Sequence, residues 1–166
     1  DAGYAVLAPN ALIGGTTFWQ TNIPPWSVLW NTSSDHAFLM AIWKAMRDGK
    51  FGPVDSDRMY AMGISSGGFM TSRMAVSYPG TFRALAVHSG SYATCSALCL
   101  VPSLPADHPP TLFLHGSEES AGVQASVKAA QERLGHGTIE LVPGGDHITT
   151  PANPVFGEKL KDFLLA

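Results

Sequence analysis

Charged residues are scarce in this chain: Asp, Glu, Lys and Arg make up 14% of its 166 residues, and the formal net charge is −3. The few Lys and Arg are scattered, so no basic stripe is available to neutralise the phosphates of nucleic acid. Long hydrophobic runs are missing too, because polar residues or proline interrupt every apolar stretch well before the roughly 20 residues that a membrane span requires. We therefore expect neither nucleic acid nor a membrane as a partner.

Cysteine is also rare, with Cys95 and Cys99 the only two. Their spacing of four in a loop rich in Ser and Ala can close a small disulfide, and two unpaired thiols are the alternative. No second Cys or His pair sits at ligand spacing, so we expect no metal site. The start of the sequence lacks a basic region followed by an apolar one, so no signal peptide is expected within it. A disulfide, low charge and four tryptophans would agree with a secreted or periplasmic protein.

The apolar content of 45% is enough for one domain with a real core, which we expect to span residues 1–166. Short apolar runs alternate with segments of helix length, as in α/β proteins. This alternation predicts a mainly parallel sheet of about five strands flanked by helices. The predicted strands are Tyr4 to Ala8, Met59 to Ile64, Ala84 to His88, Thr111 to His115 and Ile139 to Val142.

Three segments have the spacing of amphipathic helices. They are residues 35–48, with Ser34 as the expected N-cap, residues 123–134, and residues 154–165. The stretch from Asn10 to Ser33 has no clean period, and we expect an extended surface loop there.

The most informative motif is G-x-S-x-G in Gly63-Ile64-Ser65-Ser66-Gly67. It follows an apolar run and precedes a stretch compatible with a helix, which is the setting of a nucleophile elbow. There a strand turns sharply into a helix, and the serine hydroxyl stands clear of the sheet. We therefore predict Ser65 as a nucleophile and the N–H of Ser66 as one donor to the oxyanion. A second oxyanion donor cannot be identified from its usual strand.

A serine nucleophile needs a base and an acid that orients the base. His147, in the loop Pro143-Gly144-Gly145-Asp146-His147 after the last predicted strand, is the predicted base. The acid is expected in the loop after the strand that begins at Thr111, where Glu119 is the better placed residue and Glu118 the alternative.

Aromatic and apolar residues near the elbow are candidates for substrate binding. Trp19, Trp26 and Trp30 could form an apolar platform for an ester, although they could equally pack the long loop onto the body. Met70, on the predicted elbow helix, could line the pocket, but its spacing also fits core packing.

The segment from Val54 to Met70, which contains the elbow, resembles the extracellular poly(3-hydroxybutyrate) depolymerase and esterase group of α/β-hydrolases. The resemblance continues through Tyr78-Pro79, residues 86–90, Leu114-His115-Gly116 and residues 144–147. It implies an esterase without a cofactor that acts on a polyester or on short-chain or feruloyl-type esters. Carried over, it makes Ser65 the nucleophile, His147 the base, and Glu119 the acid where the group usually has aspartate.

The beginning of the chain resembles the fourth strand of the eight-stranded α/β-hydrolase sheet, so the first three strands have no counterpart. The expectation is a minimal or truncated α/β-hydrolase, whose second oxyanion donor could come from residues 10–15. The absence of that donor favours one rival function, a non-catalytic binding domain derived from a hydrolase. An open strand edge would also make pairing of two copies feasible.

Overall fold

The computed structural model describes residues 3–11, 18–91 and 103–166. Within them, β1 (Tyr60–Ile64), β2 (Ala84–His88), β3 (Thr111–Gly116) and β4 (Thr138–Val142) form one four-stranded sheet in the order β1-β2-β3-β4. Every pairing is parallel. The carboxyl ends of all four strands therefore lie at one edge of the sheet. This is the α/β fold with a parallel sheet that the alternation predicts.

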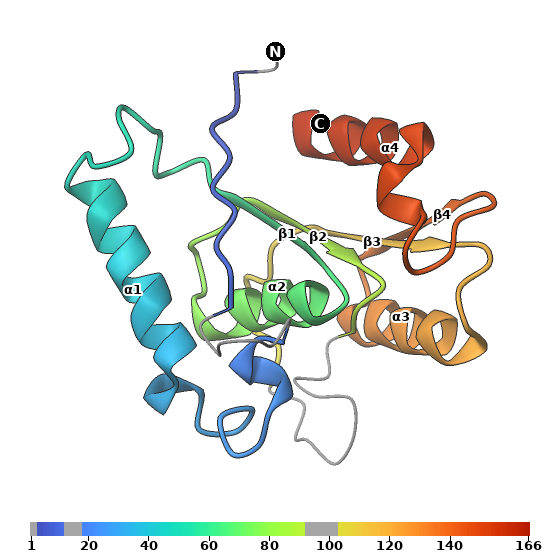
Figure 1. The fold of residues 1–166 in the computed structure, drawn as a ribbon, viewed down its shortest axis with the longest axis horizontal. Coiled ribbons are helices and arrows are strands. Elements are labelled where there is room, and N and C mark those ends of the chain that lie inside the picture. Colours follow the sequence, from blue (N-terminus) through green and yellow to red (C-terminus); the bar gives the residue numbers. More distant parts are fainter. Residues whose placement is uncertain (1–2, 12–17, 92–102) are drawn as a thin grey trace.

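Helices cover both faces of the sheet (Figure 1). Helices α2 (Ser66–Ser77) and α3 (Ala121–Leu134) lie on one face, and α4 (Pro154–Leu165) lies on the other. On the first face Val87 and Phe113 pack against Val127 of α3. On the other face Leu112 and Leu114 pack against Phe156 of α4. Strands β2 and β3 are buried throughout because they receive helices from both sides, and they form the centre of the core.

Helix α1 (Ser34–Arg47) lies beside α2 and away from the centre of the sheet (Figure 1). Its N-cap is Ser33, whose hydroxyl accepts a hydrogen bond from the N–H of His36 at 3.0 Å, so the expected cap at Ser34 is wrong by one residue. Leu39 of α1 shares a buried cluster with Trp30 and with Met70 of α2. Helix α1 thus closes a second core that does not involve the sheet.

Within residues 18–33, which precede α1, the structure contains short helices where an extended loop was expected. It contains two short 3-10 helices, η1 (Gln20–Asn22) and η2 (Trp30–Thr32), and a third, η3 (Thr150–Ala152), precedes α4. Residues 18–33 are called the N-terminal strap below. Arg73 of α2 holds this strap, because its guanidinium donates to the hydroxyl of Thr21 at 3.1 Å and to the carbonyl of Ser27 at 2.5 Å.

The predicted first strand, Tyr4 to Ala8, is not a strand, so the described sheet has four strands where about five were expected. This segment pairs with no described strand. Its fixed points are side-chain contacts of Tyr4, whose ring meets that of Tyr60 edge-on at 5.7 Å and whose hydroxyl donates to the carbonyl of Leu164 at 3.2 Å. An apolar pattern is not enough to form a strand, because the backbone N–H and C=O groups of a strand also need a neighbouring strand to bond to.

Two further findings bear on the expectations from the sequence. Among the described residues, none of the helices is long and apolar enough to cross a membrane. Cys95 and Cys99, and most of the stretch suggested for a second oxyanion donor, lie outside the described residues.

Candidate active site

Ser65 occupies a sharp turn between β1 and α2, and its backbone has φ 54° and ψ −119°. An L-residue rarely adopts a positive φ, so the surrounding structure must hold it there. The turn is possible because Gly63 lacks a side chain: a Cβ on Gly63 would lie 2.2 Å from the carbonyl oxygen of Gly67. Gly67 itself has open space where a Cβ would project. Of the two flanking glycines, only Gly63 lies at a position where a side chain would collide with the backbone.

Helix α2 begins directly after this turn, at Ser66. The first N–H groups of a helix have no partner within the helix and form its positive dipole end. The Ser66 hydroxyl is engaged elsewhere, because it accepts from the N–H of Trp19 at 2.9 Å and donates to the side-chain oxygen of Asn22 at 2.6 Å. The side chain of Ser66 therefore fastens the strap to the elbow.

His147 lies in the loop after β4, and Glu119 lies in the loop between β3 and α3. The ring nitrogen Nδ1 of His147 is 3.0 Å from Oε1 of Glu119. The Glu119 side chain is 2% exposed, whereas that of His147 is 38% exposed. The structure thus brings His147 together with Glu119 and leaves Glu118 exposed to solvent. This contact selects the tautomer of the imidazole in which Nδ1 carries the proton and Nε2 is free to accept one.

Asp146 shapes the loop that carries His147. Its carboxylate accepts hydrogen bonds from the N–H of Ile148 at 2.8 Å and from the N–H of Thr149 at 2.7 Å. These bonds, chiefly those from Thr149, lower the pKa of the Asp146 carboxyl. Asp146 therefore stays ionised at neutral pH and closes the turn, while His147 points to a different carboxylate.

Ser65, Glu119 and His147 follow β1, β3 and β4, so all three lie at the carboxyl edge of the sheet. In the described residues Ser65 makes no hydrogen bond to His147. Catalytic hydrogen bonds are often long in the absence of substrate and tighten when it binds. The arrangement has the components of nucleophilic acyl transfer: a strained serine, a helix N-terminus beside it, and an imidazole oriented by a buried carboxylate.

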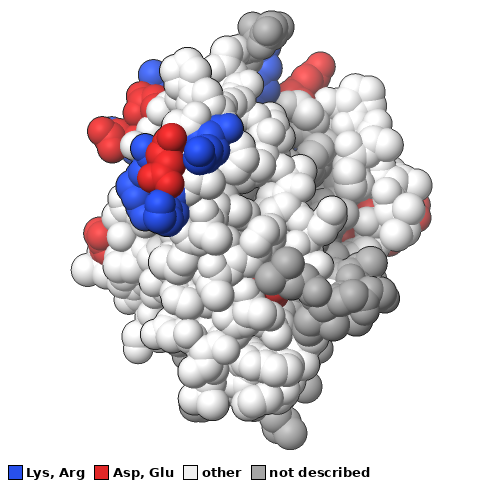
Figure 2. Space-filling model, turned by 60° about the vertical axis from the view of Figure 1, so that its left-hand side comes forward, with Lys and Arg blue, Asp and Glu red and all other residues white. Residues whose placement is uncertain are grey.

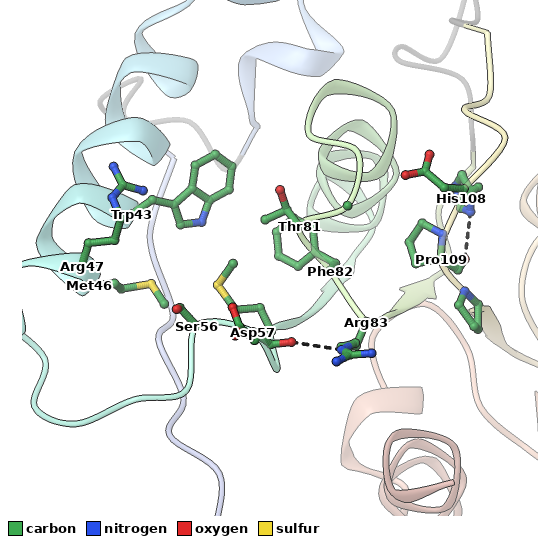
Figure 3. A pocket seen from close by; sticks show the side chains of 14 residues that line it. Trp43, Met46, Arg47, Ser56, Asp57, Thr81, Phe82, Arg83, His108 and Pro109 are labelled. Carbon is green, nitrogen blue, oxygen red and sulfur yellow. Dashed lines mark hydrogen bonds between the residues drawn. The ribbon is translucent and has the colours of Figure 1, made fainter.

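A small pocket of about 450 Å³ opens beside this pair and is lined by Glu119, Ser120, Val123, Asp146, His147 and Ile148. A larger pocket of about 770 Å³ lies elsewhere, at the opposite edge (Figure 3). Its lining includes Met59, Arg83 and Pro110, which precede β1, β2 and β3. The larger pocket is therefore at the amino ends of the strands and does not belong to the candidate active site.

The four residues suggested for substrate binding, Trp19, Trp26, Trp30 and Met70, do not form one surface. Met70 is 2% exposed within the cluster that Trp30 and Leu39 share, and Trp19 packs against that cluster. These positions favour packing roles for Met70 and Trp19. Trp26 is half-buried in the strap.

The sequence favours core and turn roles for His88 and Ser89 over catalytic ones, and the structure places both residues near the candidate site. His88, at the end of β2, is 2% exposed, and neither of its ring nitrogens has a hydrogen-bond partner among the described residues. Burial lowers its pKa to about 4, although the nearby Glu119 opposes this shift. Ser89 follows it with φ 46° and donates a hydrogen bond to Oε1 of Glu119. His88 ends the buried strand β2 and Ser89 directly follows it, so the sequence places both at the carboxyl end of a predicted strand.

A profile of the prolyl oligopeptidase family matches residues 1–99. The chain is 52% identical over 160 residues to a poly(3-hydroxyoctanoate) depolymerase of Pseudomonas fluorescens, covering 93% of this chain and 57% of the depolymerase. It is 58% identical over 43 residues to feruloyl esterase B of Thermothelomyces thermophilus, which is 26% of this chain and 15% of the esterase. The chain thus spans little more than half the length of the depolymerase that it matches.

Among solved structures, an α/β-hydrolase enzyme from the metagenome of lagoon sediments of Mar Chica, Morocco, has a similar fold. The TM-score is 0.57, the sequences are 13% identical, and the match covers 74% of this chain and 66% of that one. At this identity the likeness concerns the fold, which is that of an α/β-hydrolase. The four parallel strands and their flanking helices form part of that architecture.

Proposed function

This chain belongs to the prolyl oligopeptidase family, and on that premise we propose that it contributes the catalytic residues of a serine hydrolase that cleaves carboxylic esters. The observation that carries the proposal is the placement of a serine with φ 54° at the same sheet edge as a histidine bonded to a buried glutamate. The depolymerase and esterase relatives support an ester as the substrate class.

The reaction proceeds through an acyl-enzyme in two stages. Oγ of Ser65 forms a bond to the ester carbonyl carbon, and its proton passes to Nε2 of His147. The carbonyl oxygen becomes an oxyanion that accepts a hydrogen bond from the N–H of Ser66. The bond to the alcohol oxygen then breaks, and this oxygen takes the proton from His147.

Water attacks the acyl-enzyme in the second stage. It gives a proton to His147 as its oxygen bonds to the acyl carbon, and the bond to Ser65 breaks while Oγ recovers the proton. Glu119 accepts the hydrogen bond from Nδ1 and stabilises the imidazolium that forms in each stage. This chain thus supplies the nucleophile, the base that transfers the protons, and at least one oxyanion donor.

A neutral, apolar ester is the proposed substrate, namely a polyester or a short-chain ester. On the face shown in Figure 2, charged side chains gather in one region and most of the remaining surface is uncharged. The strap also exposes large apolar side chains, with Phe18, Val28 and Leu29 each more than half exposed. Exposed apolar surface near a site suits a ligand that lacks charge.

A fluorophosphonate probe tests this proposal, because it reacts covalently with an activated serine. The expected result is labelling of the wild-type protein that disappears in Ser65→Ala and persists in Ser66→Ala, which keeps the backbone N–H. A series of p-nitrophenyl esters of increasing acyl length then measures chain-length preference. Labelling that persists in Ser65→Ala would contradict the assignment of the nucleophile.

The second candidate function is a non-catalytic binding domain on a hydrolase fold. It is favoured by one observation, that the hydroxyl of Ser65 makes no hydrogen bond to His147 within the described residues. In that case the wild-type protein takes up no probe and hydrolyses none of the esters, while it still retains an ester polymer in a pull-down. A secreted location and pairing of two copies through the β1 edge stay predictions.

A further inference from the structure

Ser89 lies in a backbone conformation that serine rarely adopts, with φ 46°. In the described part of the chain, only Ser65 among the other non-glycine residues also has a positive φ. Ser89 is 4% exposed, so it does not lie in a free surface turn where strain could relax. A buried residue keeps such a conformation only when its surroundings hold it there.

The backbone around Ser89 is held from two sides. Its N–H donates to the carbonyl of Leu114 at 2.9 Å, which ties it to β3. The carbonyl of His88, one residue earlier, accepts from the N–H of Ser65 at 2.9 Å. One residue later, a Cβ on Gly90 would lie 2.9 Å from the backbone of Gly68. The turn at residues 88–90 is therefore packed directly against the elbow that carries Ser65.

The Ser89 side chain points to the other half of the candidate site. Its hydroxyl donates to Oε1 of Glu119, the same oxygen that lies 3.0 Å from Nδ1 of His147. The Glu119 side chain is almost completely buried, and a buried polar group needs hydrogen-bond partners such as the Ser89 hydroxyl. Ser89 thus connects the turn beside the nucleophile with the carboxylate beside the imidazole.

We propose that Ser89 is a positioning residue, whose hydroxyl sets the place and the basicity of the Glu119 carboxylate and thereby tunes the imidazole of His147. The catalytic consequence rests on the proposed function, but the hydrogen-bonded chain from Ser89 through Glu119 to His147 does not. Two donors share one oxygen. Without the Ser89 hydroxyl, Oε1 of Glu119 has only Nδ1 of His147 as its partner of the two. The carboxylate then holds the imidazolium of His147 more tightly.

The test measures the pKa of His147 by NMR, with ¹³C-labelled histidine and with His147→Gln to assign the resonance. Ser89→Ala and Ser89→Gly both remove the hydroxyl, but only glycine relieves the positive φ. We expect both variants to raise the pKa of His147 by about half a pH unit. Ser89→Gly should melt at a higher temperature than Ser89→Ala, so a folded variant is available even if alanine is poorly tolerated.

Glu119→Gln supplies the matched background. If Ser89 acts through the carboxylate, Ser89→Gly has no effect on the pKa of His147 once Glu119 is replaced. An unchanged or lowered pKa of His147 in folded Ser89→Gly would overturn the proposal. An equal shift in the Glu119→Gln background would overturn it as well, because the effect would then bypass the carboxylate.

The rate of fluorophosphonate labelling reports the catalytic consequence. In the Ser89 variants the ascending limb of its pH profile should move to higher pH by about the same half unit, and the plateau rate should fall about tenfold. A wild-type protein that takes up no probe contradicts the proposed function. The NMR titration still decides the role of Ser89 in that case, so the two failures are distinguishable.

Discussion

Gly63 and Gly67 approach each other so closely that a Cβ on Gly63 would lie 2.2 Å from the Gly67 carbonyl oxygen. This contact is between two parts of the backbone, so neither can move without opening the turn at Ser65. The reverse contact does not exist, because a Cβ on Gly67 meets no atom within 4 Å. The two glycines of the motif therefore have different physical roles, and this difference can be measured.

Gly63→Ala should lower the free energy of unfolding by about 2–3 kcal/mol, because the added methyl group forces the elbow backbone apart. Gly67→Ala is the matched control. It should leave stability unchanged or raise it by up to about 1 kcal/mol, since alanine favours a helix more than glycine does. Urea unfolding of the three proteins measures both effects. If Gly63→Ala were as stable as the wild-type protein, the turn would have room for a methyl group at this position, and the close contact would be contradicted.

Glu119→Gln should lower kcat for an ester substrate by about 10³–10⁴-fold, because an amide neither stabilises the imidazolium nor favours the tautomer with a free Nε2. Glu118→Gln should keep kcat within about twofold, since Glu118 is exposed and the carboxylate bonded to His147 is that of Glu119. Steady-state hydrolysis of a p-nitrophenyl ester compares the two variants. A larger loss in Glu118→Gln would make that residue the acid.

The stability of the fold should depend on pH through His88. Its pKa is lowered to about 4, so between its ordinary value near 6.5 and about 4 the unfolded chain binds a proton that the folded protein does not. The free energy of unfolding is therefore not reduced by His88 above pH 6.5, and it declines as the pH falls from 6.5 toward 4. The decline attributable to this residue is at most about 3 kcal/mol.

His88→Phe tests this dependence, because it keeps an aromatic ring beside Phe156, whose ring centroid is 5.0 Å from that of His88. Urea unfolding at pH 7 and pH 4.5 should show a smaller loss of stability in this variant than in the wild-type protein. His136→Gln, at an exposed position, should keep the wild-type pH dependence. An identical loss in wild type and His88→Phe would assign the acid sensitivity to other groups.

Arg73→Met should destabilise the protein by about 2–4 kcal/mol, because it removes two charge-assisted hydrogen bonds and leaves the buried Ser27 carbonyl without this donor. Arg73 is 6% exposed, and burial lowers its pKa to about 10. Arg58→Met, at an exposed position, should change stability by no more than about 0.5 kcal/mol. Limited proteolysis should cut Arg73→Met within the strap before it cuts the wild-type protein. Intact strap peptides in that variant would show that other contacts hold the segment.

Much of the fold could be predicted because it depends on short-range patterns. Apolar runs marked β1 to β4, and helical spacing marked α1, α3 and α4, with boundaries that differ by a residue or two. The error at Tyr4 to Ala8 has a different origin. An apolar run is necessary for a strand but not sufficient, since its backbone also needs a partner, and the partner is determined by distant parts of the chain.

The candidate site could be predicted in part for the same reason. The G-x-S-x-G motif is local, and His147 and Glu119 each follow a recognisable strand, so the order along the chain indicated them. Ser89 and Arg73 could not be assigned in this way. Their roles depend on contacts with Glu119, Thr21 and Ser27, which lie 30, 52 and 46 residues away.

The parallel order of the sheet also has a consequence for the life of the chain before folding is finished. Ser65 follows β1, whereas His147 follows β4, which leaves the ribosome later. A nascent chain that ends before β4 carries the proposed nucleophile without its proposed base. The proposed chemistry therefore has to wait until β4 has docked against the sheet.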